Sequence, residues 1–248
     1  MSRAAPAECP AGEAVSLIVP TYREAGNVAP LVGRVKEMAR AARLDLEMLI
    51  VDDGSDDGTI ETVRGLNEDV WLTLVVRGGR RSLSEAVLEG LRRARHDRCV
   101  VMDGDLSHPP EAVPSLLAAL DEPSVDFVLG SRFVDGGTTD PGWPLARRLN
   151  SLCARLLARP LGIEVQDPTS GFFAIRRSRV LTSSDVDPIG YKIGLELLVK
   201  CGCRNVREVP IHFFERLHGR TKLGLRQRIE YVEHLRRLWW YRRRRAVA

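Results

Sequence analysis

The sequence predicts an α/β fold built on a doubly wound, mostly parallel sheet. Two patterns in the first half of the 248 residues support this fold class. Short, almost wholly apolar runs of roughly three to six residues alternate with segments whose apolar residues recur at helical spacing. Polar residues follow each apolar run. Strands that are apolar on both faces are typical of a parallel sheet covered by helices on each side.

Five apolar runs are the predicted strands of this half. They cover residues 15–19, 48–51, 71–76, 99–102 and 127–129. Helices are predicted between them at residues 27–43, 57–66, 84–94 and 110–120. The first helix has the clearest apolar face, made by Val28, Leu31, Val32, Val35 and Met38. A helix between successive strands gives right-handed crossovers, and hence parallel strands.

After Arg132 the regular alternation ends. Residues 134–143 are rich in Gly, Asp, Thr and Pro, and a loop is predicted there. The remaining predicted elements are a helix at 145–158, a strand at 171–175, a helix at 192–200, a strand at 206–213 and a helix at 223–239. The last helix has an apolar face made by Leu225, Ile229, Val232, Leu235 and Trp239.

The composition is that of an ordinary globular protein, with 44% apolar and 28% charged residues. No stretch reaches the roughly 18 to 20 uninterrupted apolar residues that cross a bilayer. The first 13 residues lack the basic start and apolar run of a secretory signal, so a cytoplasmic location is expected. Of the five cysteines only Cys201 and Cys203 are close in sequence, which favours buried thiols over disulfides or a zinc site.

Charge is distributed unevenly along the chain. Residues 216–248 contain eleven Lys and Arg and two acidic residues, a formal charge of +9, whereas the rest of the chain carries −5. This asymmetry indicates an anionic partner, either a phospholipid surface or nucleic acid. Trp239, Trp240 and Tyr241 stand among the arginines, a combination that fits the boundary between lipid headgroups and acyl chains.

Polar residues stand at the carboxyl end of every strand predicted in the first half, where open parallel sheets bind their ligands. In chain order these residues are Pro20-Thr-Tyr-Arg-Glu24, Asp52 with Asp53, Arg77, Asp103-Gly-Asp105, and Ser131 with Arg132. This convergence predicts a ligand site at one edge of the sheet.

Asp103-Gly104-Asp105 is the strongest candidate for a metal site. Two carboxylates separated by a residue without a side chain can face one divalent cation. Mg²⁺ or Mn²⁺ held by few protein oxygens keeps coordination positions for the phosphates of a nucleoside diphosphate. A capped turn before the helix at Pro110 is the alternative, but a second carboxylate pair at Asp52 and Asp53 favours the metal.

The segment Asp52-Asp-Gly-Ser-Asp-Asp-Gly-Thr59 combines a turn and a helix cap with carboxylates that could bind a base or a ribose. Two common nucleotide motifs are absent from the sequence. Gly78-Gly79 is not a Gly-x-Gly-x-x-Gly turn and follows the third strand, and no Gly-x-x-x-x-Gly-Lys-Ser/Thr loop occurs.

Five sequence motifs stand at or near the predicted strand ends: Val19-Pro-Thr-Tyr-Arg-Glu24, Val51-Asp-Asp-Gly-Ser55, Asp103-Gly-Asp-Leu-Ser-His-Pro-Pro-Glu111, Gly130-Ser-Arg-Phe133 and Asp167-Pro-Thr-Ser-Gly-Phe-Phe173. Together they resemble the motifs of family 2 glycosyltransferases. Three later motifs extend the resemblance to the polyprenol-phosphate (dolichol-phosphate) mannose synthases: Gly190-Tyr-Lys-Ile-Gly-Leu-Glu196, Val209-Pro-Ile211 and Arg216-Leu-His-Gly-Arg-Thr-Lys-Leu223. The resemblance implies a GT-A-like nucleotide-diphospho-sugar transferase fold.

The resemblance also implies roles for individual residues. The nucleotide-sugar would be bound by Pro20, Tyr22, Glu24, Asp52, Asp53, Asp103 and Arg132. Mg²⁺ or Mn²⁺ would be held by Asp103 and Asp105. The acceptor phosphate would be bound by Arg148, Ser151, Arg216 and Lys222. The residues expected to act in catalysis are Asp105, Arg132 and Arg148.

Two positions depart from the family pattern. These synthases usually carry Gln where this chain has Ser107, which would replace one metal ligand by water. They usually carry glycines where this chain has Ser82 and Ser84, which changes the expected shape of that loop.

Three regions are expected along the chain: a disordered N-terminus at 1–13, a catalytic domain at 14–223 and a basic amphipathic helix at 224–248. Within the catalytic domain, residues 14–133 would bind nucleotide-sugar and metal, and residues 134–223 would bind the acceptor.

The implied reaction moves a hexose, above all mannose from GDP-mannose, onto a polyprenyl or dolichyl phosphate at the cytoplasmic membrane face. A phosphate acceptor is already ionised at neutral pH and needs no general base, so no catalytic histidine is expected. Direct in-line attack would invert the anomeric configuration, with alignment of the two substrates supplying much of the catalysis. Arginines of the second half could bind phosphate through two hydrogen bonds. His108 is expected to pack against its loop.

Other readings stay open at this point. The donor could instead be a UDP-sugar carrying glucose or an amino sugar, or the chain could bind sugar nucleotides without catalysis, which the intact Asp103 and Asp105 disfavour. A receiver-like phosphoacceptor module would need its acidic pair after the first strand. A nucleic-acid-binding protein would need aromatic residues interleaved with basic ones along a groove. The expected partners are therefore a nucleotide-sugar, a polyprenyl phosphate and an anionic membrane surface, with no nucleic acid.

Overall fold

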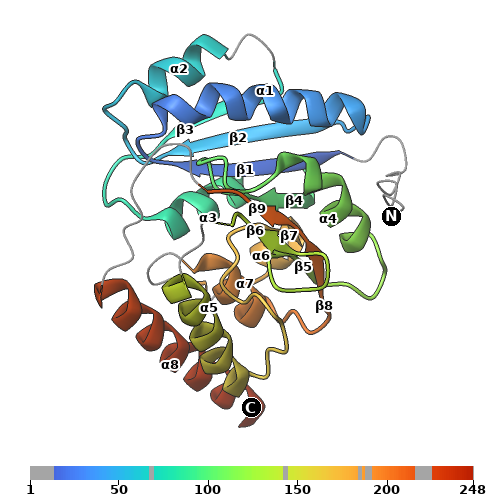
Figure 1. Ribbon diagram of the computed structural model, residues 1–248, viewed down its shortest axis with the longest axis vertical. Helices are drawn as coiled ribbons and strands as arrows, with labels where there is room; N and C mark the ends of the chain where they lie inside the picture. Colours follow the sequence, from blue (N-terminus) through green and yellow to red (C-terminus); the bar gives the residue numbers. More distant parts are fainter. Residues whose placement is uncertain are drawn as a thin grey trace.

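A seven-stranded sheet lies at the centre of the protein in a computed structural model that describes residues 14–66, 70–141, 145–183, 186–187, 192–215 and 225–247 (Figure 1). The strands are β1 (Val15–Thr21), β2 (Leu46–Asp52), β3 (Leu72–Val76), β4 (Arg98–Val101), β5 (Phe127–Ser131), β7 (Phe173–Arg176) and β8 (Val206–Pro210). Their order is β3-β2-β1-β4-β7-β5-β8, and only β7 is antiparallel to its neighbours. The predicted mostly parallel sheet is confirmed.

Helices cover both faces of this sheet, as the apolar strands predict. One face packs against α1 (Ala25–Ala41), α2 (Thr59–Leu66) and α4 (Val113–Leu120). The other face packs against α3 (Leu83–Arg93), α6 (Arg177–Leu181), α7 (Ile193–Lys200) and α8 (Leu225–Val247). Successive β1 residues divide between the two layers: Leu17 and Val19 belong to the first and Ile18 to the second. All seven β1 residues are buried.

Several elements differ in detail from the sequence predictions. The helix predicted from Pro110 begins as a 3₁₀ turn, η1 (Pro110–Ala112). The strand predicted at 206–213 is interrupted at Ile211, whose N–H donates to the carbonyl of Ser131 (3.0 Å). Its second part, β9 (His212–Phe213), pairs with β6 (Thr138–Thr139) inside the predicted loop. The five-residue helix α6 is too short for its periodicity to be recognised.

The reversed strand β7 determines what reaches the ligand-binding edge. Because β7 is antiparallel, its first residue, Phe173, lies at the edge where β4 and β5 end. The preceding segment, residues 167–172, is therefore held beside the carboxyl ends of the parallel strands. The N–H of Gly130 donates to the carbonyl of Phe172 (2.9 Å) and fixes this approach.

The C-terminal helix α8 packs on the body of the molecule and lies beside α5 (Leu145–Ala158) (Figure 1). Leu235 and Leu238 are buried in the core, and the Tyr231 hydroxyl donates to the carbonyl of Ala154 on α5 (3.0 Å). Of the predicted apolar stripe, Leu235 and Trp239 therefore pack against the protein, and the side chains of Leu225 and Ile229 lie outside the described residues. Trp240, half exposed, and Val232 face outward.

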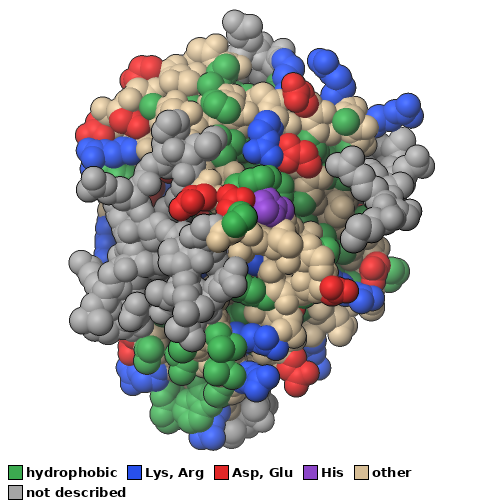
Figure 2. Space-filling view, viewed as in Figure 1, with side chains coloured by type: hydrophobic (Ala, Val, Ile, Leu, Met, Phe, Trp, Pro, Cys, Tyr) green, Lys and Arg blue, Asp and Glu red, His purple; other side chains and the backbone are tan. Residues whose placement is uncertain are grey.

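Figure 2 shows hydrophobic side chains gathered with Lys and Arg at the lower end of the molecule, over α5 and α8. No helix within the described ranges combines the length and the apolarity needed to cross a bilayer. The thiols of Cys201 and Cys203 are free, and burial raises the pKa of Cys203 to about 12. The sequence predicts buried thiols at these two positions; Cys203 is buried and Cys201 is partly buried.

Candidate active site

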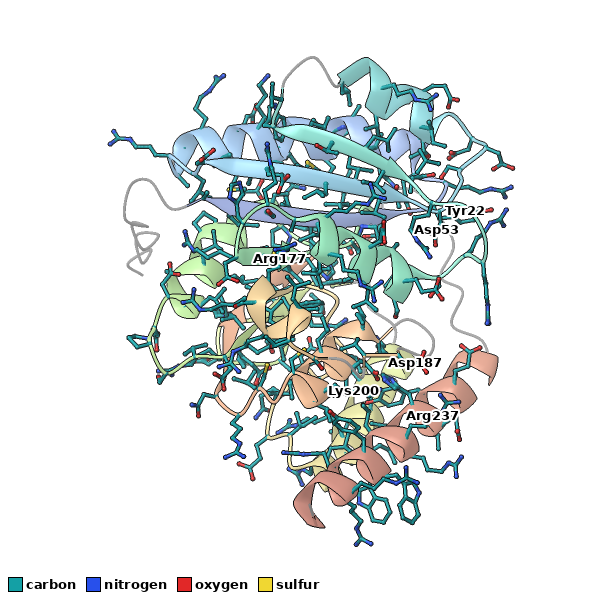
Figure 3. All side chains as sticks on the ribbon, turned by 180° about the vertical axis from the view of Figure 1, so that it is seen from behind. Tyr22, Asp53, Arg177, Asp187, Lys200 and Arg237 are labelled. Carbon is teal, nitrogen blue, oxygen red and sulfur yellow. The ribbon has the colours of Figure 1, made fainter. Side chains whose placement is uncertain are left out.

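The loops that follow β1, β2 and β4 form one side of the candidate site. The parallel register aligns Thr21 at the end of β1 with Asp52 at the end of β2, so the residues just beyond them share one edge. Figure 3 shows Tyr22 and Asp53 close together there. Pro20 is buried within β1, directly before Thr21.

Asp52 is fully buried, and both of its carboxylate oxygens bind neighbouring groups. One oxygen accepts from the Ser55 N–H (2.7 Å), and the other accepts from the hydroxyls of Thr21 (2.8 Å) and Ser55 (2.7 Å). In this structure the Asp52 carboxylate joins the loops after β1 and β2 and has no exposed surface. The expected nucleotide contact by Asp52 stays a prediction, and it would require these hydrogen bonds to rearrange.

The Asp53 side chain is 6% exposed and forms an ion pair with Arg77. Its second oxygen accepts from the Ser82 N–H (2.7 Å), and Arg77 also pairs with Glu85 (2.6 Å). Ser82 caps α3 by accepting from the Glu85 N–H (3.3 Å). Ser82, one of the two departures from the family pattern, thus gives the loop a defined helix cap.

Tyr22 and Glu24 flank a strained turn. Arg23 between them has φ of 60°, and its N–H donates to the Ser55 hydroxyl (2.8 Å). The guanidinium of Arg81 lies 4.4 Å from the centre of the Tyr22 ring. The Glu24 carboxylate accepts from the Asn27 amide (2.5 Å). The loop after β1 therefore places Tyr22 near Asp53, while Glu24 binds the first turn of α1.

The Asp103-Gly-Asp105 turn follows β4. The Asp103 side chain is 28% exposed, whereas Asp105 is 5% exposed and accepts from both the N–H (3.1 Å) and the hydroxyl (2.5 Å) of Ser107. Gly171 lies directly against Asp103, because a Cβ on Gly171 would stand 3.1 Å from a carboxylate oxygen. The loop before β7 therefore abuts this turn without a side chain between them.

His108 is a packing residue of this turn, as the sequence predicts. Its Nδ1 accepts from the Asp103 N–H (3.1 Å), and its ring stacks on Phe172 and meets the edge of Phe213. Burial lowers the pKa of His108, against the raising effect of Asp103 and Asp105. The ring is therefore neutral at neutral pH and supports the loop.

Arg132 and Asp167 form a buried, two-pronged ion pair. The Arg132 Nε and Nη2 donate to the two carboxylate oxygens of Asp167, each at 2.7 Å. Burial by itself raises the pKa of Asp167, but the hydrogen bonds and charge of Arg132 lower it below its ordinary value. The N–H groups of Gln166 (2.7 Å) and Asp167 (3.0 Å) donate to Glu208 on β8.

Asp167 is a functional candidate that sequence reasoning left without a role. Its position in the Asp167-Pro-Thr-Ser-Gly motif was the available signal. In the structure it holds the guanidinium of Arg132, while the amine of Lys192 donates to the carbonyl of Thr169 (2.8 Å) in the same loop. This loop therefore connects Asp103, through Gly171, with Arg132.

A cavity of 490 Å³ opens beside Arg132, lined also by Ser151, Leu152, Arg155 and Gln166. Arg132 and Ser151, expected at the donor and acceptor phosphates, are thus brought together. Arg148 belongs to α5, but its side chain lies outside the described residues, as do Arg216 and Lys222 altogether.

The two carboxylates of the Asp103-Gly-Asp105 turn fit a divalent cation that takes its other ligands from a substrate. Within the described ranges no three His, Cys, Asp or Glu side chains converge. Mg²⁺ and Mn²⁺ suit such an open carboxylate set, because Mg²⁺ is commonly bound by one or two carboxylates and substrate phosphates. Ser107 binds Asp105 rather than extending the set.

Solved structures of similar fold bind nucleotide-sugars. Glucosyl-3-phosphoglycerate synthase from Mycobacterium tuberculosis, in complex with Mn²⁺, UDP and glucosyl-3-phosphoglycerate, is 22% identical to this chain, with a TM-score of 0.68. The match covers 93% of this chain and 80% of that one. A second complex of that enzyme, with Mn²⁺, UDP-glucose and glycerol 3-phosphate, gives the same TM-score at 21% identity. The fold is therefore the GT-A fold of glycosyltransferases.

Sequence comparison gives the particular family. The family model described as "Glycosyl transferase family 2" matches residues 16–181, and the chain belongs to this family of enzymes. Its relatives include proteins named dolichol-phosphate mannosyltransferase. The Mycosarcoma maydis relative is 43% identical, and the match covers 92% of this chain and 79% of that protein. The Saccharomyces cerevisiae relative is 38% identical, and the match covers 92% of this chain and 87% of that protein. The Pyrococcus furiosus relative is 39% identical; the match covers 90% of this chain and 63% of that protein.

Proposed function

We propose that this glycosyltransferase moves mannose from GDP-mannose to the phosphate of a dolichyl or other polyprenyl phosphate. The observation that carries the proposal is the single loop, residues 167–171, that connects the Asp103 carboxylate with the Arg132 guanidinium. Gly171 of this loop lies against Asp103, which suits a metal-bound diphosphate, and Asp167 holds Arg132, which lines the cavity that contains Ser151. The three relatives named dolichol-phosphate mannosyltransferase support the same reaction.

On the donor side, Tyr22, Glu24 and Asp53 are proposed to contact the nucleoside, and Asp103 and Asp105 to hold Mg²⁺ or Mn²⁺. The cation supplies compensation for the charge that grows on the departing diphosphate. Asp105 is held by Ser107 and Asp103 by the turn that His108 supports, so the carboxylates need little rearrangement to bind.

The acceptor phosphate is proposed to bind Ser151, Arg148, Arg216 and Lys222. Arg132, which the sequence assigns to the nucleotide-sugar, is proposed to orient the acceptor phosphate as well, because it lines the same cavity as Ser151. The phosphate is ionised, so an oxygen of it can attack the anomeric carbon without a base. No proton needs to move to His108, whose ring is buried and already accepts a hydrogen bond. Attack opposite the departing diphosphate inverts the anomeric centre, and the aligned substrates supply much of the rate enhancement.

The lower end of the molecule is proposed to rest on an anionic membrane surface. The two adjacent helices of this end, α5 and α8, carry exposed apolar side chains: Leu152, Leu156, Leu157, Val232 and Trp240. Arg243 and Arg244 lie on the same C-terminal helix, and arginine near such a surface contributes about 1 kcal/mol. This contact would bring the cavity to a lipid acceptor on the cytoplasmic side.

The test is a panel of radiolabelled nucleotide-sugars incubated with a short polyprenyl phosphate and either Mg²⁺ or Mn²⁺. GDP-mannose should give the labelled lipid, excess chelator should stop the reaction, and the product should carry the anomer opposite to the donor. Faster transfer from UDP-glucose than from GDP-mannose would overturn the donor assignment. Absence of transfer from every donor would overturn the acceptor assignment.

A further inference from the structure

Arg155 is a half-buried residue of α5 that the proposed donor and acceptor contacts do not include. It lies one helical turn after Ser151 and lines the same cavity as Ser151 and Arg132. Arg132 is matched by the carboxylate of Asp167. Among the ion pairs of the described residues, none involves Arg155.

The described lining of this cavity contains two arginines and no Asp or Glu. With Arg132 held by Asp167, Arg155 adds a positive charge that no carboxylate of that lining offsets. A half-buried guanidinium beside a cavity that also offers hydroxyl donors is suited to a phosphate, whose oxygens match its planar arrangement of N–H groups.

The helix geometry indicates what kind of phosphate fits. Ala154 and Ala158 are buried against the protein, and Ser151 and Arg155 lie on the neighbouring side of α5, toward the cavity. The next side around the helix carries Leu152 and Leu156, which are 48% and 49% exposed. A phosphate bound at Arg155 therefore has an apolar track beside it. This arrangement suits an amphiphile with a phosphate head and a hydrocarbon chain.

We propose that Arg155 binds the acceptor phosphate, together with Arg132 and Ser151, and so determines affinity for the acceptor. This inference rests on the proposed function. The donor diphosphate is assigned to Asp103 and Asp105, neither of which lines this cavity. Arg155 therefore acts on the acceptor alone.

The experiment compares Arg155→Gln and Arg155→Lys with the wild type, using GDP-mannose and a short polyprenyl phosphate in detergent. For Arg155→Gln we expect the acceptor KM to rise at least tenfold, with the donor KM and the kcat at saturating acceptor within twofold of wild type. Arg155→Lys should be intermediate, because lysine keeps the charge and loses the planar fork. Arg159→Gln is the matched control: Arg159 is exposed one turn further along and does not line the cavity.

The outcomes separate this inference from the proposed function. An unchanged acceptor KM in a folded Arg155→Gln protein would overturn the inference, as would a rise in the donor KM instead. An equal rise in Arg159→Gln would show that only net charge matters, and would also overturn it. Inorganic phosphate should compete with the lipid more weakly against Arg155→Gln than against wild type. If wild type transfers to no polyprenyl phosphate, the proposed function itself fails.

Discussion

The donor side and the acceptor side of this site are built differently. On the donor side, carboxylates at strand ends are fixed by short hydrogen bonds from their own loops, as Asp105 is by Ser107 and Asp52 by Ser55. On the acceptor side, Ser151 and Arg155 project from α5, a helix that packs on α8 rather than on the sheet edge. The donor side is therefore pre-organised by the sheet, whereas the acceptor side depends on how two peripheral helices are held.

The largest effect should come from the donor side. Asp105→Ala removes a metal ligand and leaves the diphosphate charge uncompensated, so kcat should fall at least 10²-fold, or about 2.7 kcal/mol. Steady-state kinetics with saturating GDP-mannose would measure it. The exposed Asp45, at the opposite end of β2, provides the control Asp45→Ala, which should behave as wild type. Full activity of Asp105→Ala would remove the carboxylate turn from the mechanism.

The next largest loss of activity should come from breaking the Arg132–Asp167 ion pair, which connects the donor and acceptor sides. Asp167→Asn weakens both hydrogen bonds to Arg132, so kcat/KM should fall roughly thirtyfold, or about 2 kcal/mol. Arg207→Gln breaks an exposed ion pair with Glu122 and should change kcat/KM less than twofold. Equal effects of the two changes would mean that the Arg132 pair does not position a reacting group.

The contacts that hold α8, and with it α5, should contribute to the stability of the protein. Glu196 on α7 is buried, accepts from His234 on α8 (2.6 Å) and pairs with Lys200 (2.6 Å); Figure 3 shows Lys200 near α8. Glu196→Gln should lower the free energy of unfolding by about 1.5 kcal/mol, because hydrogen bonds to charged groups are lost. Urea denaturation measures this change. An unchanged midpoint would show that α8 is held by its leucines alone.

The Glu196 carboxylate should also make the stability of the protein depend on pH in the acid range. Burial by itself raises the pKa of Glu196, but hydrogen bonds from His234 and Lys200 lower it below its ordinary value. A lowered pKa stabilises the folded state above the ordinary value and loses that contribution as pH falls through the folded value. The stability difference between wild type and Glu196→Gln should therefore shrink below about pH 4. A constant difference from pH 7 to pH 3 would contradict this assignment.

The smallest effect should come from the outer surface. Trp240→Ser removes an exposed ring, so affinity for anionic vesicles should drop roughly fivefold, or about 1 kcal/mol, without change in thermal stability. Vesicle sedimentation measures the affinity. Removal of residues 236–248 would be a poorer test, because it deletes the buried Leu238. Equal sedimentation of Trp240→Ser and wild type would place the membrane contact elsewhere.

The sequence predicts where the donor-side loops lie, because strand ends and carboxylates lie together in the chain. Asp103 and Asp105 need only one turn to converge, and the apolar β4 before them defines where that turn lies. The partners of a carboxylate are harder to predict: Asp52 binds hydroxyls of its own loop and of β1, whereas its neighbour Asp53 pairs with Arg77 after the next strand.

The acceptor side depends on contacts between distant segments. Arg132 and Asp167 are 35 positions apart, and their pairing requires β7 to enter the sheet in reverse. Arg155 carries no motif, and only the cavity gives it a role. Periodicity also does not reveal whether the apolar stripe of α8 faces lipid or protein: Leu235 is buried in the protein, whereas Val232 is exposed.

The place of β7 also orders the assembly of the sheet. Strands β1 to β4 pair through contacts among the first 101 residues, whereas β5 has no neighbour among them. Because β7 (residues 173–176) lies between β4 and β5, the strands β5 and β8 can join the sheet of β1 to β4 only through β7. Because loop closure over such separations slows folding, insertion of β7 should be a late step, and the loop that joins the two substrate sides should form with it.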